Sequence, residues 1–519
     1  MESLSTKEYK KEFISNFKGD ESGSLMPRQT PEVLYSKTVP TPVKAPKLLA
    51  WSEDLAKELG IQKPSDQIDI NILGGNLITP SMFPYAACYA GHQFGNWAGQ
   101  LGDGRAITLG EWQNGINQSW ELQLKGAGPT AYSRRADGRA VLRSSLREYL
   151  MSEAMYYLRV PTTRALSLVS TGDDIMRDMF YDGHPEYEPG AIVMRVAPSF
   201  LRFGNFEMLA ARNEVENLTK LVNWTIEKFY PHITGKDNII NWFKEVVDRT
   251  ATLMVEWLRV GFVHGVMNTD NMSVLGLTID YGPYSFVDEY DPDFTPNTTD
   301  LPGKRYAFGR QASVAKWNLG CLGGAIAPLF SNTDELVAAL DEYDEIYLKK
   351  FYMMMGNKLG LDKVRAPDFD LIRDFEKMLS TVKPDMTIFY RRLMELPSSV
   401  ETVEEVVSHF TESFYTGTDA YKAENLFQLI NAYLVRLKAN TGSREESLLT
   451  MKAANPYFIP RNYLLHQAIE ALGNDDDGLF VKLQQAIKEP YSEKYADFFS
   501  KRPDWASEKA GCSMLSCSS

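Results

Sequence analysis

Two short segments, HGVMNTDN at 264–271 and TIDYG at 278–282, constrain the fold of this chain more than any other part of its sequence. They place Asn271 and Asp280 nine residues apart, joined by an apolar stretch that is typical of a strand. Such a connection can turn both side-chain oxygens toward one cation. Magnesium prefers oxygen ligands and completes its shell with water and nucleotide phosphates. The spacing therefore predicts a fold built around a site for magnesium and a nucleotide.

The same segments resemble the catalytic loops of protein kinases. His264 and Asn271 have the spacing of the kinase H-x-D-x-x-x-x-N loop, and Asp280 begins a DYG sequence where kinases have D-F-G. Val266 breaks the pattern, because it stands where kinases carry their catalytic aspartate and cannot accept a proton. Asp270 is the nearby carboxylate that could replace it. If it stood alone, Asp270 would more often cap a turn, and His264 would bond to the backbone.

A candidate phosphate-binding lysine and a carboxylate that could direct it lie upstream of these loops. Lys125 ends the strand-like segment SWELQLK, and Glu148 lies on the helix predicted to follow it. In kinases a strand lysine contacts nucleotide phosphates while a helix glutamate directs it. A solvated lysine at a strand end is the alternative if Lys125 is considered alone. Arg195 and Arg202 flank the end of another strand-like segment, where they either clamp phosphates or are ordinary surface charge.

Glycine-rich stretches surround Lys125 on both sides. The sequence is GQLGDGR at 99–105 and GAGPTAYSRRADGR at 126–139. Backbone N–H groups and arginine side chains in such loops can cradle phosphates, although glycine-rich turns are also common elsewhere. Together with the downstream loops, they predict one nucleotide site assembled from several segments.

The apolar pattern predicts a chain of mixed α and β structure. We expect a hairpin over about 105–125, a helix over 141–158 and strands at ALSLVS and AIVMRVA. A long helix is predicted over 237–260 and should stop at Gly261. The segment SVLGLTIDYGPYSFVDEY is predicted to form short strands, and helices are expected to dominate from Asp334 onward.

Charge and composition exclude several classes of partner. The formal net charge of −13 argues against a protein that binds nucleic-acid backbones, since phosphate contacts need clustered lysine and arginine. The chain lacks a run of about eighteen apolar residues and an N-terminal secretion pattern. We therefore expect a cytoplasmic protein that binds neither nucleic acid nor membrane, with a mitochondrial location as the alternative in a eukaryote.

The four cysteines cannot supply a secreted disulfide framework in a chain of 519 residues. Cys88 and Cys321 occupy apolar, glycine-containing contexts that are typical of buried free thiols, which favours a reducing compartment. Cys512 and Cys517 lie in the tail GCSMLSCSS, which we expect to be mobile.

The sequence resembles the selenoprotein O family of protein adenylyltransferases, enzymes with a pseudokinase-like fold that transfer AMP from ATP to protein hydroxyls. The resemblance covers most of the chain and is carried by YAGHQFGNWAGQLGDGRA, LQLKGAGPTAYSRRADGRAVLRSSLREYL, MRVAPSFLRFGNFE and HGVMNTDNMSVLGLTIDYGPYSFVD. It implies that Asp270 accepts the proton and that Asn271 and Asp280 hold Mg²⁺, with Mn²⁺ as the alternative ion. It also implies an ATP-binding set of Gly102, Gly104, Arg105, Lys125, Asp137, Gly138, Arg195, Arg202 and Asp280.

The resemblance also implies an α+β, protein-kinase-like bilobal fold with a β-rich N-lobe and an enlarged, helix-rich C-lobe. We predict an N-terminal extension over 1–80 that packs on the lobes, an N-lobe over 81–200, a C-lobe over 201–500 and a mobile tail over 501–519. Members of the family are thought to bind ATP in reversed orientation relative to kinases, which accounts for Val266. Some members carry selenocysteine near the C-terminus, where this chain has Cys517. Its thiol is either redox-active or inert.

The resemblance predicts a protein adenylyltransferase that moves AMP to Ser, Thr or Tyr hydroxyls of proteins, with the chain itself as one candidate acceptor, and releases pyrophosphate. Two alternatives stay open. One is a phosphotransferase of kinase type, which Asn271 and Asp280 favour and Val266 opposes. The other is a catalytically inert pseudokinase scaffold that only binds nucleotide.

Overall fold

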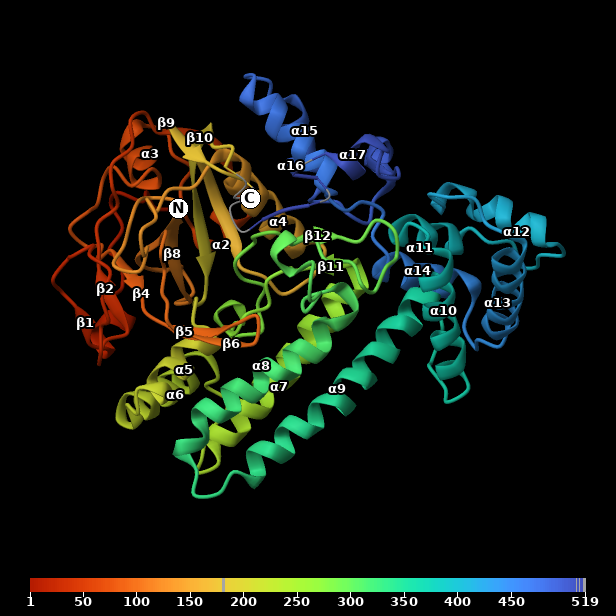
Figure 1. Ribbon diagram of the computed structural model, residues 1–519, viewed down its shortest axis with the longest axis horizontal. Coiled ribbons are helices and arrows are strands. Elements are labelled where there is room, and N and C mark those ends of the chain that lie inside the picture. The colour runs from red at the N-terminus through yellow and green to blue at the C-terminus, as the bar shows by residue number, and fades with distance from the viewer. Residues whose placement is uncertain (180–182, 510, 513, 517–519) are drawn as a thin grey trace.

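The structure is a computed structural model that describes residues 1–179, 183–509, 511–512 and 514–516. An eight-stranded sheet dominates the N-terminal part of the chain, and helices dominate the C-terminal part (Figure 1). The strand order is β1-β2-β4-β7-β8-β10-β9-β3, and only β1 and β2 pair in parallel. The strands of this sheet are β1 (Gly19–Asp20), β2 (Tyr35–Lys37), β3 (Lys47–Trp51), β4 (Tyr85–Ala87), β7 (Ala106–Gln113), β8 (Ser119–Lys125), β9 (Arg164–Arg177) and β10 (Glu186–Ala197).

The predicted hairpin and the two predicted strands form the centre of this sheet. β7 and β8 pair in antiparallel register with Ala106 opposite Lys125, and β10 pairs with both β8 and β9. Apolar side chains from β7, β8 and β10 form one core on a face of the sheet, with Leu122 and Leu124 fully buried. The sheet thus holds Lys125 at the end of a rigid central strand.

The N-terminal segment contributes strands to both edges of the sheet. β1 lies at one edge, beside β2, and β3 lies at the opposite edge, paired with β9. We expected residues 1–80 to pack on the lobes as an extension. Within that range, β1, β2 and β3 join the sheet and complete the hydrogen bonding of its outer strands, and the division of the chain into domains stays a prediction.

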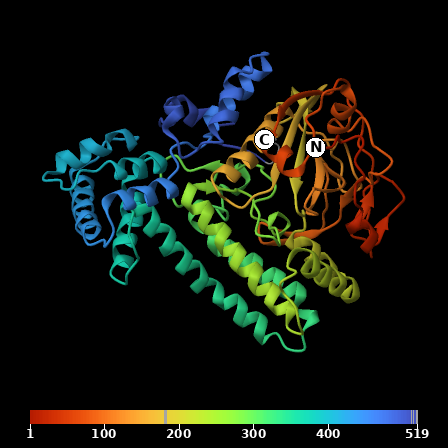
Figure 2. The same ribbon diagram turned by 180° about the vertical axis from the view of Figure 1, so that it is seen from behind.

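The predicted helices around the site are present. α4 (Leu142–Tyr157) packs against β9 and β10, and α7 (Asn238–Val260) ends at Gly261, whose φ of 79° caps the helix in the left-handed region. Both views show α7, α8 and α9 running side by side below the sheet (Figures 1 and 2). The remaining helices are α1 (Glu12–Asn16), α2 (Glu53–Leu59), α3 (Gln67–Leu73), α5 (Phe203–Ala211), α6 (Val215–Phe229), α8 (Gln311–Ile326), α9 (Asp334–Leu359), α10 (Asp368–Val382), α11 (Met386–Met394), α12 (Val403–Phe410), α13 (Ala420–Lys438), α14 (Arg444–Ala454), α15 (Asn462–Gly473), α16 (Gly478–Ala486) and α17 (Trp505–Glu508).

The prediction of several short strands after residue 272 was largely wrong. In that segment only β12 (Ser285–Phe286) is a strand, and it pairs with β11 (Phe262–Val263). The rest is loop, anchored by isolated bridges such as Thr162 to Thr278. The backbone at Asp280 is left-handed, with a φ of 57°, which interrupts any extended ladder there.

Several described residues of the C-terminal segment contact the rest of the molecule, and the mobility predicted for residues 501–519 stays a prediction. Cys512 is 4% exposed, and its carbonyl accepts a hydrogen bond from Asn462 Nδ2 at 2.9 Å. Leu515 forms a bridge with Asn297 in the loop after β12. Cys517, the candidate redox thiol, lies outside the described residues. A search of the described helices finds none long and apolar enough to cross a membrane.

A candidate nucleotide-binding site

A cavity of about 660 Å³ lies where the central strands meet the two glycine-rich segments and the 264–283 loops. Nine of the predicted site residues line it, although they come from segments far apart in the sequence. They are Gly102, Gly104, Arg105, Lys125, Asp137, Gly138, Arg195, Asn271 and Asp280. Arg202 and Asp270 do not line the cavity and lie behind it, only 1% and 8% exposed.

Asp280 is the centre of an ion-pair network at the base of the cavity. Arg195 Nη1 bonds to its Oδ1, and Arg202 Nη1 lies 2.8 Å from its Oδ2. Lys125 Nζ is 3.7 Å from Oδ1. Burial alone would raise the pKa of Asp280, but the three cations outweigh it and hold this pKa well below its usual value. Asp280 is therefore ionised at neutral pH.

Lys125 is directed by Glu148 from α4, the pairing that the sequence suggested. Its Nζ lies 2.6 Å from Glu148 Oε2, and both side chains are largely buried. The other carboxylate oxygen of Glu148 is 3.2 Å from Arg195 Nη1. Burial lowers the pKa of Lys125, while Glu148 acts in the opposite direction by favouring the charged ammonium. One carboxylate thus orients two cations toward the same cavity.

His264 has a structural role in the loop that carries Asn271. Its Nε2 donates to the Ile279 carbonyl at 2.9 Å, and its Nδ1 accepts from the Val266 N–H at 3.3 Å. The ring is buried against Trp257, and burial lowers its pKa, so it is neutral. These backbone bonds tie the segment before Asp280 to the 264–271 loop. Bonding of His264 to the backbone is the alternative that the sequence analysis left open for this residue.

Asn271 and Asp270 share the short 3₁₀ turn η1 (Thr269–Asn271) but differ in exposure. Asn271 Nδ2 donates to the Val266 carbonyl at 2.9 Å, which leaves its side-chain oxygen available in the cavity. Asp270 lies beneath Gln93, which lines the cavity and donates to Asp270 Oδ2 at 3.3 Å. Asp270 Oδ1 has no hydrogen-bond partner among the described residues. Burial raises the pKa of Asp270 to about 6.

The glycine-rich segments form the outer wall of the cavity. Asp137 holds Arg177, the last residue of β9, through two hydrogen bonds of 2.8 Å, so its carboxylate positions a cation at the cavity. The Arg105 side chain forms no ion pair or hydrogen bond with the described residues, which leaves its guanidinium available to a ligand.

Sequence reasoning missed the buried residues that support the arginines. Asp103 is 3% exposed and accepts hydrogen bonds from Tyr89 Oη and Gln123 Nε2, both at 3.2 Å. It also lies 3.8 Å from Arg202 Nη2, while Gln123 accepts from Arg195. The aspartate between Gly102 and Gly104 is apparent in the segment GQLGDGR. The residues around it in the sequence do not indicate that it lies near an arginine about a hundred residues away.

Replacing Gly138 with Ala is expected to lower the free energy of unfolding by at least about 1 kcal/mol. Gly138 has a φ of 65°, and an added Cβ would lie 2.1 Å from the Gly128 carbonyl oxygen. The two ends of the glycine-rich segment 126–139, which meet where the Gly128 N–H donates to the Gly138 carbonyl at 3.1 Å, would have to separate, and this should also weaken nucleotide binding. Thermal unfolding with and without ATP measures both effects. Gly324→Ala in α8 is the control, since nothing lies within 4 Å of its added Cβ. Equal stability of the two variants would contradict the assigned packing.

The fold and the site together define a nucleotide-binding protein of the protein-kinase type. Its markers are a strand lysine paired with a helix glutamate, an asparagine on the 264–271 loop and an aspartate at the start of DYG. The chain matches the family described as protein adenylyltransferase SelO over residues 26–488, and it therefore belongs to the SelO family.

Similar proteins extend over nearly the whole chain. A protein nucleotidyltransferase YdiU from Cytophaga hutchinsonii is 60% identical over 519 residues, covering 100% of both chains. Relatives of the same name from Azoarcus sp. and Flavobacterium johnsoniae are 50% and 49% identical, covering 98% and 95% of each chain. Among solved structures, ROP2 from Toxoplasma gondii, described as a virulence factor with a protein-kinase fold and no enzymatic activity, is 12% identical. It covers 68% of this chain and 87% of its own, and its TM-score of 0.22 is too low to support a conclusion.

Proposed function

We propose that this chain transfers AMP from ATP to Ser, Thr or Tyr hydroxyls of proteins and releases pyrophosphate. The observation that carries the proposal is the single cavity that gathers Lys125, Arg195 and Asp280 while Val266 occupies the position of the kinase base. The family supports nucleotidyl transfer in general. The choice of AMP and of hydroxyl acceptors is the finer step that we propose.

The cavity has the charge that a triphosphate needs, although the chain as a whole is acidic. Fixed cations that are already oriented stabilise the charge of the phosphates and of the departing pyrophosphate without reorganising during the reaction. Among the described residues, six cations and four carboxylates line the cavity: Arg105, Lys125, Arg134, Arg139, Arg177 and Arg195, with Asp103, Asp137, Asp178 and Asp280. We propose that Arg202, which is buried behind Asp280, acts on the nucleotide by positioning that carboxylate.

Asp270 is the proposed proton acceptor. In the transfer, the acceptor oxygen forms a bond to the α-phosphorus while the bond from that phosphorus to the α–β bridging oxygen breaks. The bonding electrons leave with pyrophosphate, and the hydroxyl proton passes to the carboxylate. The unpartnered Oδ1 of Asp270 has the capacity to accept it. Gln93 covers this carboxylate, so a hydroxyl must approach beside the Gln93 side chain.

The residues present fit a magnesium ion, with manganese as the alternative. Asn271 presents a side-chain oxygen, because its amide nitrogen is already bonded, and Asp280 is held ionised by its cations. Both line the same cavity and offer oxygen atoms, the ligand type that magnesium prefers. When bound, the ion would neutralise phosphate charge. Asn271 and Asp280 would orient the triphosphate through it.

The proposal also covers the acceptor proteins and the cellular location. The acceptor proteins include the chain itself as a candidate, and a cytoplasmic location without nucleic-acid or membrane partners is still our prediction. A kinase-type phosphotransferase is the first alternative, and an inert nucleotide-binding scaffold is the second. The network around Asp280 favours catalysis over the scaffold, because it keeps every charged residue that the site requires.

Labelled nucleotides separate these functions. With Mg²⁺ and a cell lysate as acceptor, label on the α-phosphate of ATP should appear on protein, while label on the γ-phosphate should not. UTP labelled on the α-phosphate tests whether adenine is the preferred base, because the relatives carry the broader name nucleotidyltransferase. Transfer from the γ position alone would establish the phosphotransferase. The scaffold would be established if neither lysate proteins nor the chain itself gained more label than they do with an Asp280→Ala variant.

A further inference from the structure

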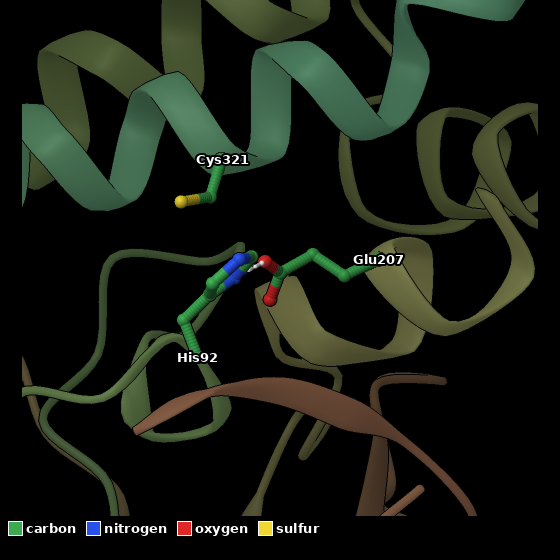
Figure 3. A group of neighbouring side chains, drawn as sticks. All are labelled: His92, Glu207 and Cys321. Atoms are coloured by element: carbon green, nitrogen blue, oxygen red, sulfur yellow. Dashed lines mark hydrogen bonds and ion pairs between the residues drawn. The ribbon is translucent and has the colours of Figure 1, made fainter. Parts of the chain in front are cut away.

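Three side chains with metal-binding atoms meet outside the nucleotide cavity (Figure 3). His92 comes from β5 (Ala90–Gln93), which pairs with β6 (Asn96–Gln100), while Glu207 comes from α5 and Cys321 from α8. His92 Nδ1 lies 2.6 Å from Glu207 Oε1. One ligand atom of each residue lies within 4.8 Å of the others. Three separate elements thus bring an imidazole, a carboxylate and a thiol close together.

Glu207 is poorly satisfied without a further ligand. Its side chain is 3% exposed, and Oε2 has no hydrogen-bond partner among the described residues. Burial raises the pKa of Glu207, although the Thr269 hydroxyl and His92 act to lower it. Burying a carboxylate with an unpaired oxygen is costly, and a bound cation would remove that cost.

His92 is held in place by aromatic rings on both elements that flank it. Its ring centroid lies 5.0 Å from that of Trp97 on β6 and 5.4 Å from that of Trp317 on α8. The Arg305 guanidinium lies 4.7 Å from the centroid of the Trp317 ring, and its charge acts to lower the pKa of Cys321. The two tryptophans restrict the imidazole to a narrow range of orientations, as preorganised ligands require.

We propose that His92, Glu207 and Cys321 bind one Zn²⁺ ion, with water in the fourth position. Zinc accepts nitrogen, oxygen and sulfur ligands in a tetrahedral arrangement, whereas magnesium and calcium take oxygen. Zinc bonds of about 2.0–2.3 Å place neighbouring ligand atoms roughly 3–4 Å apart. The three ligand atoms here all lie within 4.8 Å of one another, so small movements would bring them to that spacing. The hydrogen bond between His92 and Glu207 opens to admit the ion.

Zinc binding also requires that Cys321 lose its proton. Burial and the Glu207 charge raise the pKa of this thiol to about 12, although Arg305 acts to lower it. The thiol is therefore protonated in the absence of metal, and zinc binding displaces the proton to solvent as the sulfur becomes a ligand.

The proposed zinc would reinforce the turn that carries Asp270. The His92 N–H donates to Thr269 Oγ1 at 2.7 Å, and the next residue, Gln93, donates to Asp270. The ion would tie β5 to α5 and α8 and so fix this turn. Zinc binding itself does not depend on AMP transfer, so its test can fail or succeed separately from the proposed function.

The test measures metal content directly. The full chain is purified without a metal-affinity step, stripped with a chelator, dialysed against zinc and analysed by mass spectrometry of its metals. We expect one zinc ion per chain. The variants Cys321→Ser and His92→Gln should each lower the zinc affinity at least about 10-fold. Removing a residue that only hydrogen-bonds to a metal ligand already has an effect of about that size, and these variants remove the ligands themselves. Zinc should raise the melting temperature of the unmodified chain and of neither variant.

Two control variants separate this site from others. Cys512→Ser removes a buried thiol elsewhere, and Asp280→Asn removes a ligand of the proposed magnesium site, so both should keep the zinc. Cobalt in place of zinc should give a thiolate-to-metal absorption band that Cys321→Ser abolishes. Zinc content that is unchanged in Cys321→Ser and His92→Gln would overturn the proposal, as would a chain that retains no zinc after dialysis.

Discussion

Replacing Asp280 with Asn is expected to lower the rate of AMP transfer by about 10³-fold or more. The change keeps the size of the side chain but removes the charge that organises Arg195, Arg202 and Lys125. It also removes the anionic oxygen proposed as a metal ligand. Asn suits the left-handed backbone at this position, because Asn and Asp adopt it more readily than other residues with side chains. Initial rates with ATP labelled on the α-phosphate measure the effect.

The matched control for this variant is Asp288→Asn. Asp288 also pairs with two arginines, lying 2.5 Å from Arg461 and 3.7 Å from Arg502, but it does not line the nucleotide cavity. Breaking a buried pair costs about 3–5 kcal/mol of stability, so the melting temperature of each variant must be measured beside its rate. The site assignment predicts that Asp288→Asn retains activity while folded. Activity of Asp280→Asn within about 10-fold of the unmodified chain would contradict the assignment.

Replacing Lys125 with Met is expected to lower the rate at least about 100-fold. Met keeps most of the apolar stem and removes the ammonium that Glu148 directs into the cavity. The loss should fall on the catalytic rate more than on ATP affinity, because Arg195 and the outer arginines still bind the phosphates. Glu148→Gln should have a smaller effect, since Lys125 would keep its contact with Asp280 at 3.7 Å. Steady-state kinetics with varied ATP separates the two quantities.

Lys37→Met is the control for this second variant. Lys37 also ends a strand of the same sheet, but its side chain is exposed and lies outside the cavity. It should retain full activity. If Lys37→Met and Lys125→Met lost activity equally, the effect would come from the sheet in general and the proposed contact with phosphate would be wrong.

Local patterns in the sequence were sufficient for much of the framework. The hairpin that ends at Lys125 and the helix that stops at Gly261 were both confirmed, because each depends on periodicity and turn residues within a short window. The spacing of Asn271 and Asp280 also indicated a shared cavity. The short strands expected around Asp280 did not form, because the loop is shaped by contacts with distant segments such as Thr162.

The sequence by itself was enough to predict a kinase-like nucleotide site and to exclude Val266 as its base. The tertiary structure decided which side chains face the cavity. It placed Arg202 behind Asp280, covered Asp270 with Gln93, and brought His92, Glu207 and Cys321 together from three elements. The physical reason is distance along the chain. Strands and helices follow from hydrogen bonds between near neighbours, whereas these ion pairs and clusters exist only after distant segments have packed and excluded water.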